Sequence, residues 1–217
     1  MTKEVAQSIL TTPLRELTCE QLAEYTNSAH EWSDQFLALL PRYMELIAQS
    51  QWPTDLDADH ILGRFRYAPD QPLTPSENAA FDGWLLTLFE LTLCSPIVAE
   101  ELDCALAFRN QPSWTGFGND ICDVIEVALP TPFDTGRFQT LWENCANREA
   151  DLRLATTTVF GIGAQRFSRS RFFPGRTREQ AAVWYEWFMV TDHRERLSRA
   201  FERETDPRAQ ELLLMAI

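Results

Sequence analysis

The most concentrated chemistry in the sequence is a group of arginines in its last third. Five arginines and three phenylalanines fall within residues 166–178, and no acidic residue occurs there before Glu179. A guanidinium binds carboxylate or phosphate through two parallel hydrogen bonds, and exposed aromatic side chains add contact area. The segment therefore predicts a binding site for an anion or a partner. The candidate site residues are Arg166, Arg169, Arg171, Arg176, Arg178, Phe172 and Phe173.

The same arginines have a second interpretation, in which they form an internal clamp with acids of the protein itself. Residues 1–150 carry 8 basic and 23 acidic side chains, whereas residues 151–217 carry 11 basic and 9 acidic ones. Replacement of Arg166, Arg169 and Arg171 by Gln separates the two interpretations. An external site predicts lost binding with unchanged melting, and an internal clamp predicts a marked fall in melting temperature.

A second, smaller group of charged and aromatic residues lies nearer the N-terminus. Its members are Arg42, Glu45, Arg64, Arg66 and Tyr67. Such residues either bind a ligand or form a buried ion-pair network that locks two helices together. We favour the ion-pair network for this group.

Metal and cofactor chemistry finds little support in the sequence. Asp55–His60 is rich in aspartate, but a calcium loop would need Gly and Glu where His60 and Arg66 stand. Carboxylates favoured at a helix N-terminus account for the same residues. Gly161–Gly163 begins like a dinucleotide-binding loop, but Arg166 occupies the place of the third glycine. We therefore expect no metal site, no cofactor and no catalytic residue.

The cysteines and the N-terminal residues bear on the compartment. The five cysteines are widely spaced and include no Cys-x-x-Cys pair, which favours buried free thiols in a reducing environment. The start at Met1–Glu4 leads into no apolar run of signal-peptide length. No stretch reaches the ~18 consecutive apolar residues that a membrane span needs. We therefore expect a cytoplasmic protein.

Helix-start signals recur along the chain. Thr18–Gln21, Thr74–Glu77 and Thr177–Gln180 have the spacing of a capping box, in which two side chains bind each other's backbone N–H groups. Ser95–Pro96 and Asp206–Pro207 place a proline at the first helical position behind a capping residue. Apolar residues at helical spacing follow these signals, whereas the two-residue turns of β-hairpins are rare.

These signals predict an all-α fold of about nine or ten short helices in a single domain, residues 1–217. The arrangement is either a compact multi-helix bundle or an irregular helical solenoid, because no fixed repeat period is present. The β-branched run Thr156–Phe160 allows one short β-hairpin near residues 156–173. One continuous core is expected from Phe36, Leu40, Leu46, Ile61, Leu62, Phe65, Trp84, Leu88 and Phe89.

Three stretches in the first half of the chain form a recognisable pattern. Phe36–Leu46 is similar to FLPR-x-x-EL, Leu62–Ala68 is similar to LG-K/R-x-x-YA, and Pro75–Glu77 opens a long helix. In these features the chain resembles a group of uncharacterised bacterial all-helical proteins. The resemblance covers roughly residues 29–90 and the helix at residues 192–206. The group has no assigned function, so the resemblance implies a helical bacterial protein and assigns no catalytic residue.

The charge of the chain narrows the choice of partner. A net charge of −13 repels nucleic acid and anionic lipid, and it attracts a basic partner at long range. We therefore expect a non-catalytic interaction protein, adaptor-like or immunity-like, that presents an acidic helical surface to a basic protein. Two alternatives stay open. One is a small-molecule hydrolase or transferase with an unrecognised polar cleft, and the other is an anion or nucleotide sensor that uses the Arg-rich 166–178 loop.

Overall fold

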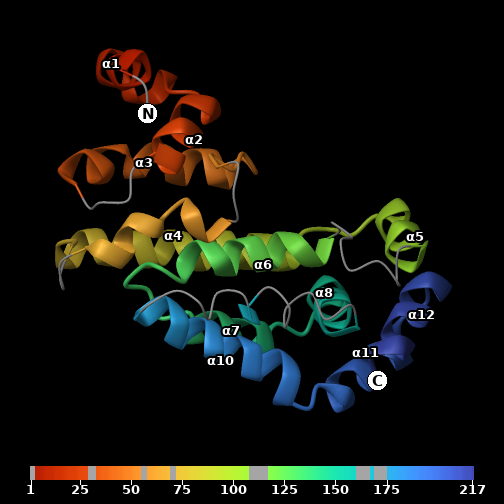
Figure 1. The fold of residues 1–217 in the computed structure, drawn as a ribbon. Coiled ribbons are helices and arrows are strands. Elements are labelled where there is room, and N and C mark those ends of the chain that lie inside the picture. Colours follow the sequence, from red (N-terminus) through yellow and green to blue (C-terminus); the bar gives the residue numbers. More distant parts are fainter. Residues whose placement is uncertain are drawn as a thin grey trace. The chain divides into compact units, whose positions relative to one another are not determined.

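The computed structural model is helical throughout the part of the chain that it describes (Figure 1). That part comprises residues 3–28, 33–54, 58–68, 72–107, 117–159, 167–168 and 175–217. Eleven α-helices and no strand occur within it, which confirms the all-α prediction. None of its helices is long and apolar enough to cross a membrane.

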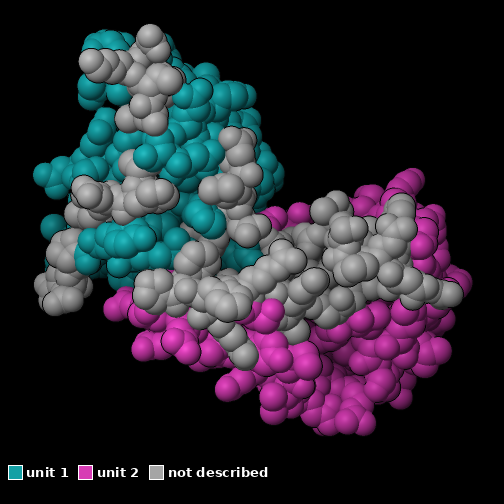
Figure 2. Space-filling model, viewed as in Figure 1, with its two compact units in different colours: residues 1–88, 126–133 teal, residues 89–125, 134–217 magenta. Residues whose placement is uncertain are grey.

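The chain divides into two compact units (Figure 2). Unit 1 consists of Met1–Leu88 and Glu126–Phe133, and unit 2 consists of Phe89–Ile125 and Asp134–Ile217. The division falls inside two helices, α4 (Pro75–Cys94) and α6 (Phe117–Ala128), and not in a linker. The expectation of a single domain over residues 1–217 stays a prediction.

Short helices and 3₁₀ turns make up unit 1. Besides the first part of α4 it contains α1 (Lys3–Thr11), η1 (Leu14–Glu16), α2 (Cys19–Ser28), α3 (Asp34–Ala48), η2 (Ala58–His60) and η3 (Gly63–Tyr67). The predicted capping box forms, since Thr18 N donates to Gln21 Oε1 at 2.9 Å and Gln21 N donates to Thr18 Oγ1 at 3.2 Å. The second box also forms, with Thr74 N donating to Glu77 Oε2 at 2.8 Å. These helix starts are therefore set by residues close in sequence.

Two segments of unit 1 refine the sequence interpretation. Helix α3 continues through Pro41 as a single helix, capped by Ser33, whose Oγ accepts a hydrogen bond from Phe36 N at 3.3 Å. Gly63–Tyr67 forms a 3₁₀ helix, with Gly63, Arg64 and Phe65 buried.

An aromatic chain runs through the core of unit 1. The Phe36 and Phe65 rings meet edge to face at 5.4 Å, Phe65 contacts Phe81 at 5.7 Å, and Phe81 contacts Trp84 at 5.6 Å. Phe36, Phe65 and Phe81 are buried, as expected, whereas Trp84 is only half-buried. Trp84 therefore lies at the margin of this core and not at its centre.

Unit 2 packs its helices around α8. Besides the last part of α4 and most of α6 it contains α5 (Ala99–Ala107), α7 (Gly136–Asn144), α8 (Arg148–Val159), α10 (Arg176–Val190), α11 (Arg194–Arg203) and α12 (Pro207–Ala216). Helices α10, α11 and α12 all contact α8, and α12 also contacts α11 and α5. As a result, every side chain from Ala150 to Thr157 is buried.

The β-branched run at the end of α8 is helical, so the suggested hairpin is wrong for residues 156–159. Its threonine hydroxyls donate back to carbonyls one turn earlier: Thr156 to Leu152 O at 2.8 Å and Thr157 to Arg153 O at 2.9 Å. This bonding satisfies polar groups inside a buried helix, where tertiary packing overrides β propensity. The remainder of the suggested hairpin lies outside the described residues, apart from residues 167–168, which are helical.

The predicted capping box at Thr177 and Gln180 is also wrong. Helix α10 starts two residues earlier, after Gly175 with φ at 62°, a left-handed conformation that glycine adopts readily. Thr177 is buried, and the Gln180 side chain accepts a hydrogen bond from Thr135 N at 3.0 Å. A contact between residues 45 positions apart thus replaces the local cap.

The core of unit 2 is a cluster of aromatic rings. Phe89 stacks on Phe138 with ring centroids 4.2 Å apart, and Trp142 touches Phe89 at 5.9 Å. The cluster continues through Phe167, Trp184, Trp187 and Phe188. Phe89 belongs to unit 2, so the expected core that joined it to Phe36 and Phe65 is divided between the two units.

Candidate functional site

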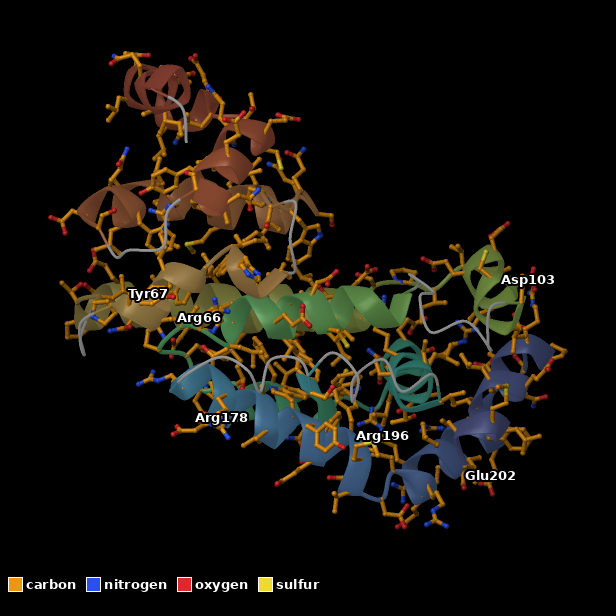
Figure 3. The ribbon with its side chains drawn as sticks, viewed as in Figure 1. Arg66, Tyr67, Asp103, Arg178, Arg196 and Glu202 are labelled. Carbon is orange, nitrogen blue, oxygen red and sulfur yellow. The ribbon has the colours of Figure 1, made fainter. Side chains whose placement is uncertain are left out.

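The structure describes two of the predicted site residues, Arg176 and Arg178. Both side chains are exposed at the first turn of α10, where Figure 3 labels Arg178. Neither arginine makes an ion pair with a described residue. The other five candidates, Arg166, Arg169, Arg171, Phe172 and Phe173, lie outside the described residues. Convergence of these arginines on one site stays a prediction.

The first aromatic residue of the same segment is part of the core and not of a surface. Phe167 is fully buried, and its ring stacks on Phe188 at 5.8 Å with an interplanar angle of 4°. It also contacts Trp184 at 5.9 Å. The expectation that the phenylalanines between the arginines are exposed is therefore wrong for Phe167, which anchors the segment to α10.

For the smaller charged group in unit 1, the expected single ion-pair network stays a prediction, and the described contacts concern Arg42, Glu45 and Arg64. Arg42 pairs with Glu45 one turn further along α3 at 2.7 Å, and its Nε donates to Leu17 O at 2.8 Å. Tyr67 is exposed. Figure 3 shows Arg66 and Tyr67 as neighbours at η3.

Arg64, from the same group, is a buried cation held by rings and a carbonyl. Its guanidinium lies 3.7 Å from the centre of the Tyr25 ring, and its Nη2 donates to Tyr25 O at 2.7 Å. It makes no ion pair with any residue that the structure describes. Burial lowers the pKa of Arg64, while Tyr25 and Tyr43 act in the opposite direction. The aromatic face and the carbonyl dipole thus offset part of the desolvation of the charge.

Charge is distributed unequally between the units. Unit 1 contains 14 acidic and 5 basic residues, whereas unit 2 contains 18 acidic and 14 basic ones. In unit 1, Arg64 is buried and Arg42 is engaged by Leu17 and Glu45, so two of its few cations are held internally. The surface of unit 1 is consequently more acidic than its composition alone indicates.

Three exposed acids of unit 1 form no ion pair within the described part of the chain. Glu16 on η1, Glu24 on α2 and Asp34 on α3 make no ion pair with any described residue. Leu10 and Leu14, on α1 and η1, are 68 % and 38 % exposed. Exposed carboxylates and exposed apolar side chains on α1, η1, α2 and α3 make these elements the candidate partner-binding surface of unit 1.

In unit 2, one carboxylate is buried and paired with arginines of the same unit. Asp151 on α8 is 2 % exposed, and its two oxygens accept hydrogen bonds from Arg196 Nε at 2.6 Å and Arg203 Nη2 at 3.2 Å. Arg196 also donates to Trp142 O and Cys145 O, both at 2.7 Å. Burial raises the pKa of Asp151, and Arg196 acts in the opposite direction. Arg196 therefore ties α11 to both α8 and the end of α7.

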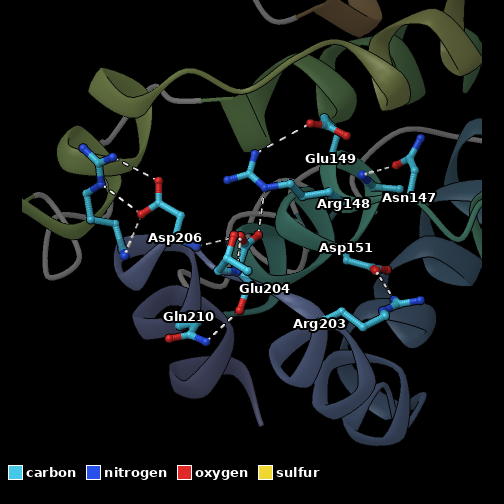
Figure 4. A network of polar contacts seen from close by, with 11 residues as sticks. Asn147, Arg148, Glu149, Asp151, Arg203, Glu204, Asp206 and Gln210 are labelled. Carbon is cyan, nitrogen blue, oxygen red and sulfur yellow. Dashed lines mark hydrogen bonds and ion pairs between the residues drawn. The ribbon is translucent and has the colours of Figure 1, made fainter.

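The network continues along the start of α12 (Figure 4). Arg148 Nε donates to Glu204 Oε2 at 2.8 Å, and Gln210 Nε2 donates to Glu204 O at 2.7 Å. Asp206 caps α12 as predicted, because Arg208 N donates to its Oδ1 at 2.9 Å. The arrangement fixes the junction between α11 and α12 on α8.

Sequence analysis missed the Asp151 network. The available signal was the spacing of Arg196 and Arg203, which stand seven residues apart and so share one face of α11. Their partner lies 45 and 52 positions away, and no local pattern specifies it. The network stabilises the fold of unit 2, since Asp151, Arg196 and Arg203 all bind groups of that unit.

Four of the five cysteines differ from the expectation of buried thiols. Cys122 is buried, but Cys94 and Cys104 are exposed, and Cys19 and Cys145 are half-buried. Cys94 Sγ and Cys145 Sγ lie 3.8 Å apart. No group of three or more metal-ligating side chains occurs among the residues described.

Comparisons with protein-family models, with curated proteins and with solved structures give no match for this chain. The resemblance to a group of bacterial helical proteins stays a prediction. The functional argument therefore depends on the geometry of the two units.

Proposed function

We propose that the protein is a non-catalytic interaction protein, adaptor-like or immunity-like, whose unit 1 binds a basic protein partner. The observation that supports this proposal is the set of exposed carboxylates, Glu16, Glu24 and Asp34, that make no ion pair with a described residue. A partner with arginine or lysine at matching positions supplies the missing countercharge. Leu10 and Leu14 add apolar contact area of the kind that gives an interface its affinity.

An interface between an acidic surface and a basic partner should be sensitive to salt. Opposite charge accelerates encounter by long-range attraction, and salt screens that attraction over about 8 Å at physiological ionic strength. Binding should therefore weaken as salt is raised, chiefly through slower association. A partner held by apolar contacts alone would respond little to salt.

The test compares two variants that lose the same charge from different units. The first carries Glu16→Gln, Glu24→Gln and Asp34→Asn in unit 1. The second, a matched control, carries Glu179→Gln, Glu186→Gln and Glu202→Gln at exposed positions of unit 2. Each protein is immobilised and offered a host lysate, and captured proteins are identified by mass spectrometry at low and high salt.

The proposal predicts a basic protein that the wild type and the unit 2 variant retain and the unit 1 variant loses. Retention should also fail at high salt. Equal capture by both variants would show that the acids of unit 1 do not form the interface. Melting curves of all three proteins establish that the substitutions leave the fold intact.

A second candidate function is an anion or nucleotide sensor that uses the 166–178 segment. The observation in its favour is that Arg176 and Arg178 are exposed and make no ion pair with a described residue. Inorganic pyrophosphate should then raise the melting temperature of the wild type, and Arg176→Gln with Arg178→Gln should remove the effect. Arg15→Gln, at another exposed arginine, is the control. The cytoplasmic location and the hydrolase or transferase alternative stay predictions.

A further inference from the structure

Two cysteines that are 51 positions apart in the sequence meet in unit 2. Cys94 is the last residue of α4, and Cys145 is the C-cap of α7. Their Sγ atoms are 3.8 Å apart, with Cys94 exposed and Cys145 half-buried. Both thiols are free in this structure, and a small approach of the two sulfurs would bring them to bonding distance.

We propose that Cys94 and Cys145 are a reversible oxidation site, at which a hydroperoxide converts the two thiols into a disulfide. Transient disulfides of this kind are the ones found in reducing compartments, where they act in catalysis or redox sensing. The proposal does not depend on the partner-binding function, because every residue that carries it belongs to unit 2.

The contacts of Cys94 Sγ indicate that this thiol reacts with the peroxide first. Asn147 Nδ2 donates a hydrogen bond to Cys94 Sγ at 3.0 Å. Asn147 is also the N-cap of α8, since its Oδ1 accepts from Ala150 N at 2.7 Å. Cys94 Sγ therefore lies beside the positive end of the α8 dipole, and a donor points at it. Cys94 is also the exposed member of the pair, so a peroxide can reach its sulfur directly.

Arg153 brings a cation to the same place. Its side chain is 3 % exposed, and its Nη1 donates to Ser95 O at 3.0 Å and to Leu93 O at 3.4 Å. These two carbonyls belong to the residues on either side of Cys94. The guanidinium makes no ion pair with a described residue, so its charge is not neutralised by a direct carboxylate contact. Its two hydrogen bonds hold the backbone on both sides of Cys94.

Cys145 is placed to act second. Arg196 Nη2 donates to Cys145 O at 2.7 Å, and this contact fixes the backbone that carries the thiol. Burial raises the pKa of Cys145 from 9.0 to about 11, so this thiol stays protonated at neutral pH. The pair thus consists of an accessible attacking thiol and a sheltered thiol held beside it.

The reaction proceeds in two steps that balance. The Cys94 thiolate attacks the terminal peroxide oxygen and breaks the O–O bond, giving a sulfenic acid and, after protonation of the leaving oxygen, an alcohol, or water when the oxidant is hydrogen peroxide. The Cys145 sulfur then attacks the Cys94 sulfur and displaces hydroxide, which takes the Cys145 proton to form water. The two sulfurs together lose two electrons, and the hydroperoxide gains them. A dithiol such as dithiothreitol reverses the change.

Closure of this disulfide joins the end of α4 to the junction between α7 and α8. A cross-link that closes a long loop restricts the unfolded chain and raises stability. The melting temperature should accordingly rise by roughly 5–10 °C on oxidation. Oxidation of an isolated thiol would give no such rise.

The experiment treats the full chain with hydrogen peroxide, blocks the remaining thiols and maps peptides by mass spectrometry without reductant. The expected product is a Cys94–Cys145 cross-linked peptide with two fewer hydrogens, which dithiothreitol releases. Cys145→Ser should stop the reaction at the Cys94 sulfenic acid, which dimedone traps. Cys104→Ser, at another exposed cysteine, is the control and should behave as the wild type.

Asn147→Asp tests the role of the donor with the helix cap retained. Aspartate caps a helix as well as asparagine does. The substitution removes the hydrogen bond to Cys94 Sγ and adds a negative charge beside it. Oxidation should therefore slow several-fold, while the melting temperature of the reduced protein stays unchanged. The proposal is overturned if the oxidised wild type yields no Cys94–Cys145 peptide, or if Cys104 replaces either residue in the cross-link. An unchanged oxidation rate in Asn147→Asp would contradict the assignment of Cys94 as the first thiol to react.

Discussion

The two units stabilise a buried charge in different ways. In unit 1, Arg64 is buried against the Tyr25 ring and a backbone carbonyl, with no ion pair to a described residue. In unit 2, Asp151 is buried between two arginines, Arg196 and Arg203. The first arrangement uses dipoles and an aromatic face, and the second uses opposite charge.

This difference has a consequence for the surface. Because Arg64 is satisfied without a carboxylate, it neutralises none of the acids of unit 1. The exposed Glu16, Glu24 and Asp34 of that unit make no ion pair with a described residue. Unit 2 pairs some of its acids with arginines, as in the exposed pair Arg199–Glu195, whereas its exposed Glu179, Glu186 and Glu202 make no ion pair with a described residue. The contrast supports the proposal that unit 1 carries the partner-binding surface, whereas buried ion pairs stabilise unit 2.

The largest effect should come from breaking the buried ion pair of unit 2. Asp151→Ala leaves Arg196 without its carboxylate in a site that is largely closed to water. Loss of one partner of a buried pair destabilises by about 3–5 kcal/mol. Urea denaturation measures this change. The control is Glu195→Ala, which breaks an exposed ion pair on α11 and should cost about 0–1 kcal/mol. Similar values for the two variants would contradict the role given to Asp151.

A somewhat smaller effect is expected for the buried cation of unit 1. Arg64→Ala removes the contact with the Tyr25 ring, the hydrogen bond to Tyr25 O and the packing of the side-chain stem. Together these contributions are worth about 2–4 kcal/mol. The control is Arg15→Ala at an exposed position of the same unit. If Arg64→Ala unfolds like the control in urea, the ring and the carbonyl do not offset the buried charge.

The exposed arginines at the start of α10 should contribute little to stability. Arg176→Gln together with Arg178→Gln breaks no ion pair with a described residue, so the free energy of unfolding should change by less than about 0.5 kcal/mol. A larger loss in the same urea assay would favour the internal clamp over an external site. This outcome would weaken the anion-sensor alternative and leave the proposal for unit 1 untouched.

The smallest effect concerns pH and the cap of α12. The hydrogen bond from Arg208 lowers the pKa of Asp206 from 3.8 to about 2. Since the folded pKa lies below the unfolded value, the stabilisation is present above about pH 4 and disappears as the pH falls towards 2. Asp206→Asn keeps the cap and removes the titration. The difference in melting temperature between wild type and variant should therefore shrink between pH 5 and about pH 2, and a constant difference would contradict this assignment.

Local chemistry made the helix starts predictable. The capping boxes at Thr18–Gln21 and Thr74–Glu77 and the Asp206 cap form as expected, because each needs only residues within three positions of one another. The capping box predicted at Thr177–Gln180 does not form, because the Gln180 side chain accepts a hydrogen bond from Thr135 N, 45 positions away. A cap pattern is therefore a prediction that a long-range contact can override.

The sequence by itself determined that the protein is helical and acidic. Helical periodicity, capping residues and charge are properties of residues near one another or of the chain as a whole. The tertiary structure alone decided that Thr156–Val159 is helical, because burial on α8 outweighs the β preference of that run. It also decided which arginines meet Asp151 and that Cys94 meets Cys145. Those contacts join residues 45 or more positions apart, and only the packing of the helices brings them together.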